Sequence, residues 1–198
     1  MQAYLTIPLT YHTMAYDIKD VFYLDTGIET TTSTGDGAQM LDLSAYIDPI
    51  ARGKSKATGL AIYKVHFDVV DDGGNNPVPP TTNGQLRVAL MSNPGITSAA
   101  VGGISFANDT LNAGNALVAA GSDYAFGGSA AGDPYQPQQK WLEPSKEVPY
   151  VVVRDSVLLA VVVGIAMGAN TNVFCRLECA QISLDQSTLN QLLRTQTV

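Results

Sequence analysis

The densest cluster of oxygen-bearing side chains follows a run of apolar residues in the first half of the chain. Asp68, Asp71 and Asp72 stand close together, and Asn75 and Asn76 come directly after them. Carboxylate and amide oxygens are the ligands that Ca²⁺ prefers in proteins. The order of these residues does not follow the EF-hand loop, so we interpret the stretch as a solvated turn. A calcium site on Asp68, Asp71 and Asp72 is the alternative, and apart from it the sequence predicts no metal and no cofactor.

Catalytic side chains are scarce in this sequence. Of the two histidines, His66 falls on the outward half of an alternating segment, and His12 ends another such segment. The chain has no G-x-x-x-x-G-K-[ST] phosphate loop, no H-E-x-x-H zinc motif and no G-x-S-x-G nucleophile motif. A histidine on an exposed face is more often a solvated side chain than a base. We therefore expect no enzymatic activity and assign no catalytic residue.

One tripeptide resembles a catalytic signature. Asp25-Thr26-Gly27 follows the apolar run 21–24, and it resembles the motif of aspartic proteases, in which two such aspartates share a proton. Ile28 stands where that family has Ala or Ser, and the chain holds a single copy, so a protease would have to be a homodimer. We favour a strand that ends in a turn, because Asp and Gly are common turn residues. The protease is kept as a third hypothesis.

The two cysteines, Cys175 and Cys179, stand four residues apart on a segment that alternates between apolar and polar residues. In a strand both would face the side of Val173 and Leu177, roughly 13 Å apart at ~3.3 Å per residue. That separation is beyond the reach of a disulfide. The sequence therefore predicts two buried thiols that act as small hydrophobic residues.

Composition and charge further restrict the classes of function that this chain can have. The chain of 198 residues is 45% hydrophobic and 15% charged, with a net charge of −7. In soluble domains about a quarter of the residues are usually charged. A surface poor in charge is typical of a protein that buries much of its surface against neighbours. The first fifty residues hold seven acidic residues and one basic residue, Lys19. Nucleic-acid binding depends on Lys and Arg, so we expect no direct binding to nucleic acid.

Alternation of apolar and polar residues is the dominant pattern, and it predicts an all-β sandwich. We expect strands within residues 2–12, 17–25, 60–70, 84–91 and 172–184, two more within 148–168 that meet near Arg154, and a short strand or a turn with a short helix at 39–50. Residues 26–38 are predicted to be a loop. In the segment 60–70, Ala61, Tyr63, Val65, Phe67 and Val69 are expected to face the core and Ile62, Lys64, His66 and Asp68 to face outward. The Val-rich run after Arg154 lacks alternation, which indicates burial on both faces.

Residues 92–147 break this pattern, since they hold eight of the 18 glycines together with many Ala, Asn and Ser. We interpret them as a long inserted loop or protrusion, with one short helix at 109–120. Trp141 is expected to anchor this loop by packing, and a sugar-stacking platform with Tyr135 and Tyr150 is the alternative.

The tail, residues 185–198, is predicted to hold a short amphipathic helix at 187–196 with three leucines on one side. It would be marginal alone, so we expect it to dock on a neighbour or on its own sandwich. The sequence gives seven interface candidates: Tyr4, Tyr11, Met14, Tyr16, Leu189, Leu192 and Leu193. The whole chain, 1–198, is expected to be one domain.

The order of segments supports a family resemblance. It runs from L-D-L-S-A-Y-I and L-A-I-Y-K-V-H-F-D-V-V-D through L-R-V-A-L and the Gly/Ala-rich stretch to V-V-V-R-D-S-V-L-L-A-V and L-E-C-A-Q-I. Over residues 39–184, at the level of strand order, it resembles the single jelly-roll coat proteins of tailless icosahedral viruses of bacteria and archaea. The resemblance implies an eight-stranded jelly-roll sandwich.

The resemblance also implies partners and a location. It implies a homo-oligomer, as pentamers, trimers or pseudo-hexamers, in a shell built from this chain alone or with a second capsid protein. The N-terminal part has no basic arm, which departs from RNA-packaging coats and suits a virus whose genome lies behind an internal membrane or a separate nucleoprotein. The location would be the virion, after synthesis in the host cytoplasm. The second hypothesis is a β-sandwich recognition module: a carbohydrate-binding, adhesion or fibre-head protein.

Overall fold

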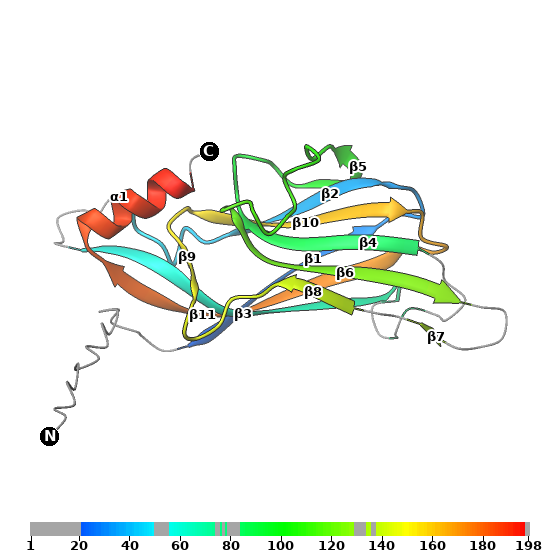
Figure 1. Cartoon of the computed structure of the whole chain (residues 1–198), viewed down its shortest axis with the longest axis horizontal. Coiled ribbons are helices and arrows are strands. Elements are labelled where there is room, and N and C mark those ends of the chain that lie inside the picture. The colour runs from blue at the N-terminus through cyan, green and yellow to red at the C-terminus, as the bar shows by residue number, and fades with distance from the viewer. Residues whose placement is uncertain are drawn as a thin grey trace, which may run out of the picture.

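The computed structural model describes residues 21–49, 56–73, 76, 78, 84–128, 134–135 and 138–196. Two antiparallel sheets stack face to face, and one helix lies at one end of the stack (Figure 1). The four-stranded sheet contains, in spatial order, β1 (Phe22–Thr30), β11 (Thr171–Leu184), β3 (Ala57–Asp71) and β9 (Tyr150–Val152). The seven-stranded sheet contains β5 (Ala99–Ile104), β2 (Gly35–Asp42), β10 (Ser156–Ile165), β4 (Gly84–Ser92), β6 (Val118–Gly128) and β7 (Pro134–Tyr135), with β8 (Gln138–Leu142) also paired to β6.

The connectivity of the two sheets is that of a jelly roll. Eight strands form the sandwich, in the orders β1-β11-β3-β9 and β2-β10-β4-β6. The chain crosses from one sheet to the other at each step between these eight strands except from β4 to β6, which pair directly. Such crossing connections between two antiparallel sheets define the jelly roll. The predicted all-β sandwich is confirmed, with eleven strands rather than eight within the described residues because β5, β7 and β8 extend the second sheet.

Apolar side chains fill three layers. The central layer lies between the sheets, and its fully buried members include Leu60, Ile62, Val88, Leu90, Leu159, Val161 and Leu177. A second layer lies on the other side of the four-stranded sheet beneath the helix α1 (Gln186–Thr195), and it includes Ala61, Tyr63, Ile182, Leu184 and Leu189. A third layer, on the outer side of the seven-stranded sheet, includes Met91, Leu111, Leu117, Leu158 and Ala160. Strand β10 therefore has both faces buried, as its lack of alternation predicts.

A bulge changes which side chains of β3 reach the core. Lys64 pairs with Glu178 and Ile62 pairs with Cys179, so Tyr63 is an extra residue on β3. An extra residue shifts the inward–outward alternation by one position. The prediction is correct for Val65 and Val69 but wrong for Ile62, which is fully buried between the sheets. Ala61 and Tyr63 are also buried, but under α1 rather than in the central layer.

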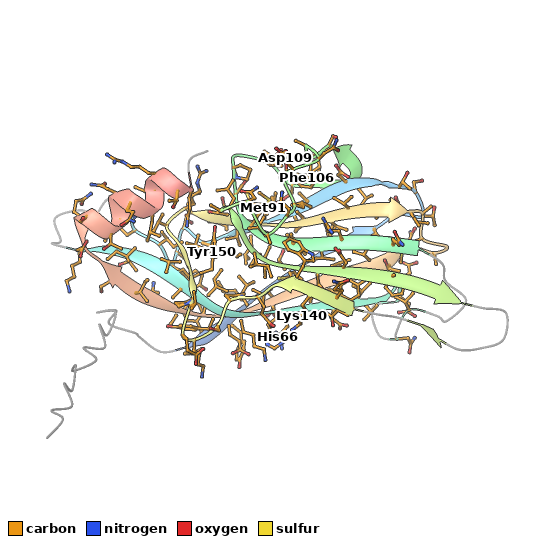
Figure 2. The ribbon with its side chains drawn as sticks, in the orientation of Figure 1. His66, Met91, Phe106, Asp109, Lys140 and Tyr150 are labelled. Carbon is orange, nitrogen blue, oxygen red and sulfur yellow. The ribbon has the colours of Figure 1, made fainter. Side chains whose placement is uncertain are left out.

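The segment 92–147 is part of the sandwich rather than one long loop. It supplies β5, β6, β7 and β8, and β6 forms a full ladder with β4. Its irregular part, residues 105–117, lies over the outer face of the seven-stranded sheet, where Phe106 and Asp109 project in Figure 2. The helix predicted at 109–120 is absent; residues 108–117 form turns and β6 starts at Val118. A small residue is required at Gly121, where a Cβ would overlap the Trp141 ring.

The loop predicted at 26–38 is also much shorter than expected. β1 continues to Thr30 and β2 starts at Gly35. Thr30 is buried, and its hydroxyl hydrogen-bonds the Thr171 hydroxyl at 2.7 Å, so a threonine-rich stretch can form strand. The strands predicted within 60–70, 84–91, 148–168 and 172–184 are confirmed. The N-terminal strand predicted within residues 2–12 lies outside the described residues.

Candidate interaction surface

The outer side of the four-stranded sheet is divided into a covered half and an open half. α1 covers one half, where Leu189 is buried and Leu192 and Leu193 are partly buried. The open half is formed by β1, β11 and β3, and we call it the β1–β11–β3 face. Figure 2 shows His66 projecting from this side, opposite Phe106 and Asp109.

The strand register arranges the side chains of this face in rows. Each row takes one residue from β1, one from β11 and one from β3, because directly paired residues of neighbouring strands point to the same side. The rows are Tyr23–Glu178–Lys64, Asp25–Arg176–His66 and Gly27–Phe174–Asp68. The face therefore mixes two aromatic rings with charged groups of both signs.

Two pairs of polar side chains link the strands. Arg176 Nε donates to Asp25 Oδ1 at 2.5 Å, and His66 Nε2 lies 2.8 Å from Glu178 Oε1. The hydrogen bond with His66 lowers the pKa of Glu178 below its usual value. Exposed pairs of this kind contribute little to stability. Their main effect here is to fix the positions of donors and acceptors on the face.

The two aromatic rings are exposed to solvent. Tyr23 is 60% exposed and Phe174 is 44% exposed. The Arg176 guanidinium lies 6.0 Å from the centre of the Tyr23 ring, within the range of a cation–π contact. Phe174 lies over Gly27, where a Cβ would come within 2.7 Å of the ring. Glycine at this position in the strand therefore makes room for the ring.

These residues surround a concavity of about 920 Å³. Its lining consists of Tyr23, Asp25, Thr26, Gly27, His66, Asp68, Phe174, Cys175, Arg176 and Glu178. The concavity is broad, and two of its carboxylates are paired, Asp25 with Arg176 and Glu178 with His66. Such a surface is suited to recognising a ligand through side chains.

The Asp25-Thr26-Gly27 tripeptide lies in the middle of β1 and not at a turn, which corrects the expectation that the strand ends there. Asp25 forms an ion pair with Arg176 and not a contact with a second carboxylate among the described residues. An aspartic protease dyad needs two carboxylates that share a proton.

The candidate calcium ligands do not converge in the described part of the chain. Asp71 accepts hydrogen bonds from the Asn76 backbone N–H at 3.2 Å and from the Asn76 side chain at 3.1 Å. Asp68 and Asp72 are exposed. No group of three His, Cys, Asp or Glu side chains is positioned for a metal ion among the residues that the structure describes.

The outer face of the seven-stranded sheet carries a second polar cluster. Arg87 makes two hydrogen bonds of 2.7 Å with Asp123, and its guanidinium lies 5.3 Å from the centre of the Trp141 ring. The Trp141 indole N–H donates to Asp123 Oδ1 at 3.2 Å, and the ring packs against Gly121. Trp141 is thus a packing anchor for β8.

The interface candidates fall into two groups. Tyr4, Tyr11, Met14 and Tyr16 lie outside the described residues. The three leucines lie on the side of α1 that packs on its own sheet, and Leu189, which is 1% exposed, has no surface left for another copy. Leu192 and Leu193 are partly buried, and their contact with a neighbour stays a prediction.

Sequence reasoning did not single out the β1–β11–β3 face. It placed Cys175, Cys179, Val173 and Leu177 on one side of β11, and all four are buried in the central layer. The available signal was Phe174, a large aromatic residue in the polar half of that alternation.

No protein-family model and no curated protein matches this sequence. Among solved structures, a chain from the cryo-EM structure of Mud crab tombus-like virus is similar, with 11% sequence identity and a TM-score of 0.31. The similarity covers 85% of this chain and 92% of that chain. The fold assignment given above rests on the strand connectivity. In the part of the chain that the structure describes, a search for helices capable of spanning a membrane finds none.

Proposed function

We propose that this protein is a viral capsid protein that assembles with copies of itself into a closed icosahedral shell. The observation that carries the proposal is the jelly-roll connectivity of the two sheets. Jelly rolls form viral shells, lectins and cupins, so the fold alone allows several functions. In this proposal the protein is not an enzyme, is made in the host cytoplasm and ends in the virion, alone or with a second capsid protein.

Packing and composition support assembly. The loop on one sheet and α1 on the other give the sandwich three buried apolar layers. Only 15% of the residues are charged. Large exposed apolar side chains occur on both sheets, directly before β1 and in the loop before β9: Val21, Tyr23, Met40, Val148, Ile165 and Phe174. A closed shell needs contacts on several sides of each subunit, which such a distribution provides.

Electron microscopy and analytical ultracentrifugation of the expressed chain test this proposal. We expect pentamers, trimers or complete particles. A chain that remains monomeric at high concentration and in varied salt would contradict it. An aspartate scan over the exposed apolar residues named above should yield at least one variant that fails to assemble but keeps its thermal unfolding midpoint.

The concavity on the β1–β11–β3 face favours a second candidate, the β-sandwich recognition module. Such a module would stay small in solution and bind a ligand. Particle size therefore separates the two functions before any ligand is known.

A further inference from the structure

The two exposed rings of the β1–β11–β3 face have the arrangement of a stacking platform. Tyr23 pairs with Glu178, and Phe174 lies four residues further along β11, so the rings are separated by about 13 Å along the strands. Phe174 can lie across β1 because residue 27 is glycine, although glycine weakens a strand interior.

Donors and acceptors lie between the rings, from Asp25 and Arg176, and beside Tyr23, from Glu178. The carboxylates of Asp25 and Glu178 accept hydrogen bonds, while the Arg176 guanidinium donates them. The hydroxyl groups of a sugar both donate and accept, and the C–H groups on a sugar face pack on aromatic rings. A ligand that combines these two properties would match the whole face.

The backbone of β11 is not available to a ligand, whereas β1 forms an edge of its sheet within the described residues. β11 is the central lining strand, and it is paired along its length with β1 on one side and β3 on the other. An extended peptide binds a sheet through unpaired backbone groups at an edge. A ligand seated over β11 is therefore recognised by side chains, and an extended peptide could pair only along the outer edge of β1.

Charge decides between neutral and acidic ligands. Three carboxylates line the concavity, from Asp25, Asp68 and Glu178, against one guanidinium and one imidazole. An acidic sugar would meet net negative charge there, which lowers its affinity.

We propose that the β1–β11–β3 face binds a neutral oligosaccharide, with Tyr23 and Phe174 stacking on two different sugars of one chain. A single sugar ring is too short to bridge the two aromatic side chains, so several linked sugars are needed. This inference concerns a ligand and does not depend on shell assembly.

Saturation-transfer NMR with the full chain tests the proposal. The probes are cellotriose, maltotriose, chitotriose and 2′-fucosyllactose, with 3′-sialyllactose as an acidic counterpart built on the same lactose core. We expect at least one neutral probe to bind and 3′-sialyllactose not to bind. Tyr23→Ala and Phe174→Ala should each weaken binding by roughly tenfold, about the loss of one stacking contact. Met40→Ala, which removes an exposed apolar side chain from β2, should leave binding unchanged.

Three outcomes would overturn the inference: no neutral probe binds at millimolar concentration, binding survives in both aromatic variants, or the two variants abolish self-association instead. In the last case the face belongs to a contact with another copy. Particles that form without any sugar binding would support the capsid proposal and contradict the sugar-binding inference. Sugar binding by a stable monomer would support the sugar-binding inference and contradict the capsid proposal.

Discussion

Cys175 and Cys179 lie in the central apolar layer, and both are free thiols. Burial raises the pKa of both, that of Cys179 to about 12, so the reactive thiolate is scarce at neutral pH. We expect a thiol reagent such as DTNB to modify neither cysteine in the native protein and both after denaturation. Rapid modification of the native chain would show that the sheets separate locally far more often than this packing allows.

The Trp141 ring of β8 packs against β6 at Gly121, where the absence of a side chain leaves room for it. A Cβ at Gly121 would overlap the Trp141 ring. Gly121→Ala should therefore displace the indole, loosen β8 and lower the free energy of unfolding by about 1–3 kcal/mol. Trp141 is the single tryptophan of the chain, so its fluorescence reports the displacement directly.

Gly127 is a matched control on the same strand, β6. A Cβ there would meet no atom within 4 Å. Gly127→Ala should leave the fluorescence unchanged and the stability equal or slightly higher. Equal effects of the two substitutions would mean that strand propensity, and not contact with Trp141, decides the result.

At the scale of elements, α1 depends on one buried side chain. Leu189 is 1% exposed and packs with Ile182 and Leu184 of β11. Leu189→Ala should lower the free energy of unfolding by about 2–5 kcal/mol, measured by guanidinium denaturation. Leu193→Ala, at a partly buried position of the same helix, should cost clearly less. If the two losses are equal, α1 is not held by this cluster.

The cap at the N-terminus of α1 makes a pH-dependent contribution to the stability of the folded protein. The Asp185 carboxylate accepts the Thr188 backbone N–H at 2.7 Å, which lowers the pKa of Asp185 below 3.8. A lowered pKa in the folded state means that the stabilisation is present above the unfolded-state pKa and is lost as the pH falls through the folded-state pKa. We expect Asp185→Asn, which keeps a capping oxygen, to remove this part of the acid dependence below about pH 4. Thermal unfolding midpoints between neutral pH and pH 2 measure it; a variant that loses stability with acid as steeply as the parent would contradict the assignment.

Strands with clear periodicity could be predicted from the sequence, as β4 and β11 show. The sequence could not predict which side chains of β3 face the core, because the bulge at Tyr63 depends on pairing with β11. β6 was missed because small residues such as Gly121 and Ser122 give no apolar alternation; they are there because Trp141 and β8 pack against them. The β1–β11–β3 face was missed for a related reason. Its rows join residues more than a hundred positions apart, and only the register brings them together.

At the scale of the whole molecule, net charge opposes the assembly that the jelly roll and the exposed apolar side chains favour. Each copy carries a net charge of −7 at pH 7, with an isoelectric point near 4.6. Like-charged copies repel one another, and salt screens this repulsion: the screening length falls from about 10 Å at 0.1 M to about 3 Å at 1 M. Apolar contacts between copies do not depend on screening in this way.

We therefore expect assembly to strengthen with salt at pH 7 and, at low salt, to strengthen as the pH is lowered toward the isoelectric point. Sedimentation velocity across a salt series, repeated at two pH values, measures both trends. The lower pH should stay above 4, because acid also weakens the start of α1 through Asp185. A shell that instead dissociates in high salt would show that ion pairs, and not apolar contacts, join the copies. Its contacts would then have to be sought among the charged side chains of the surface.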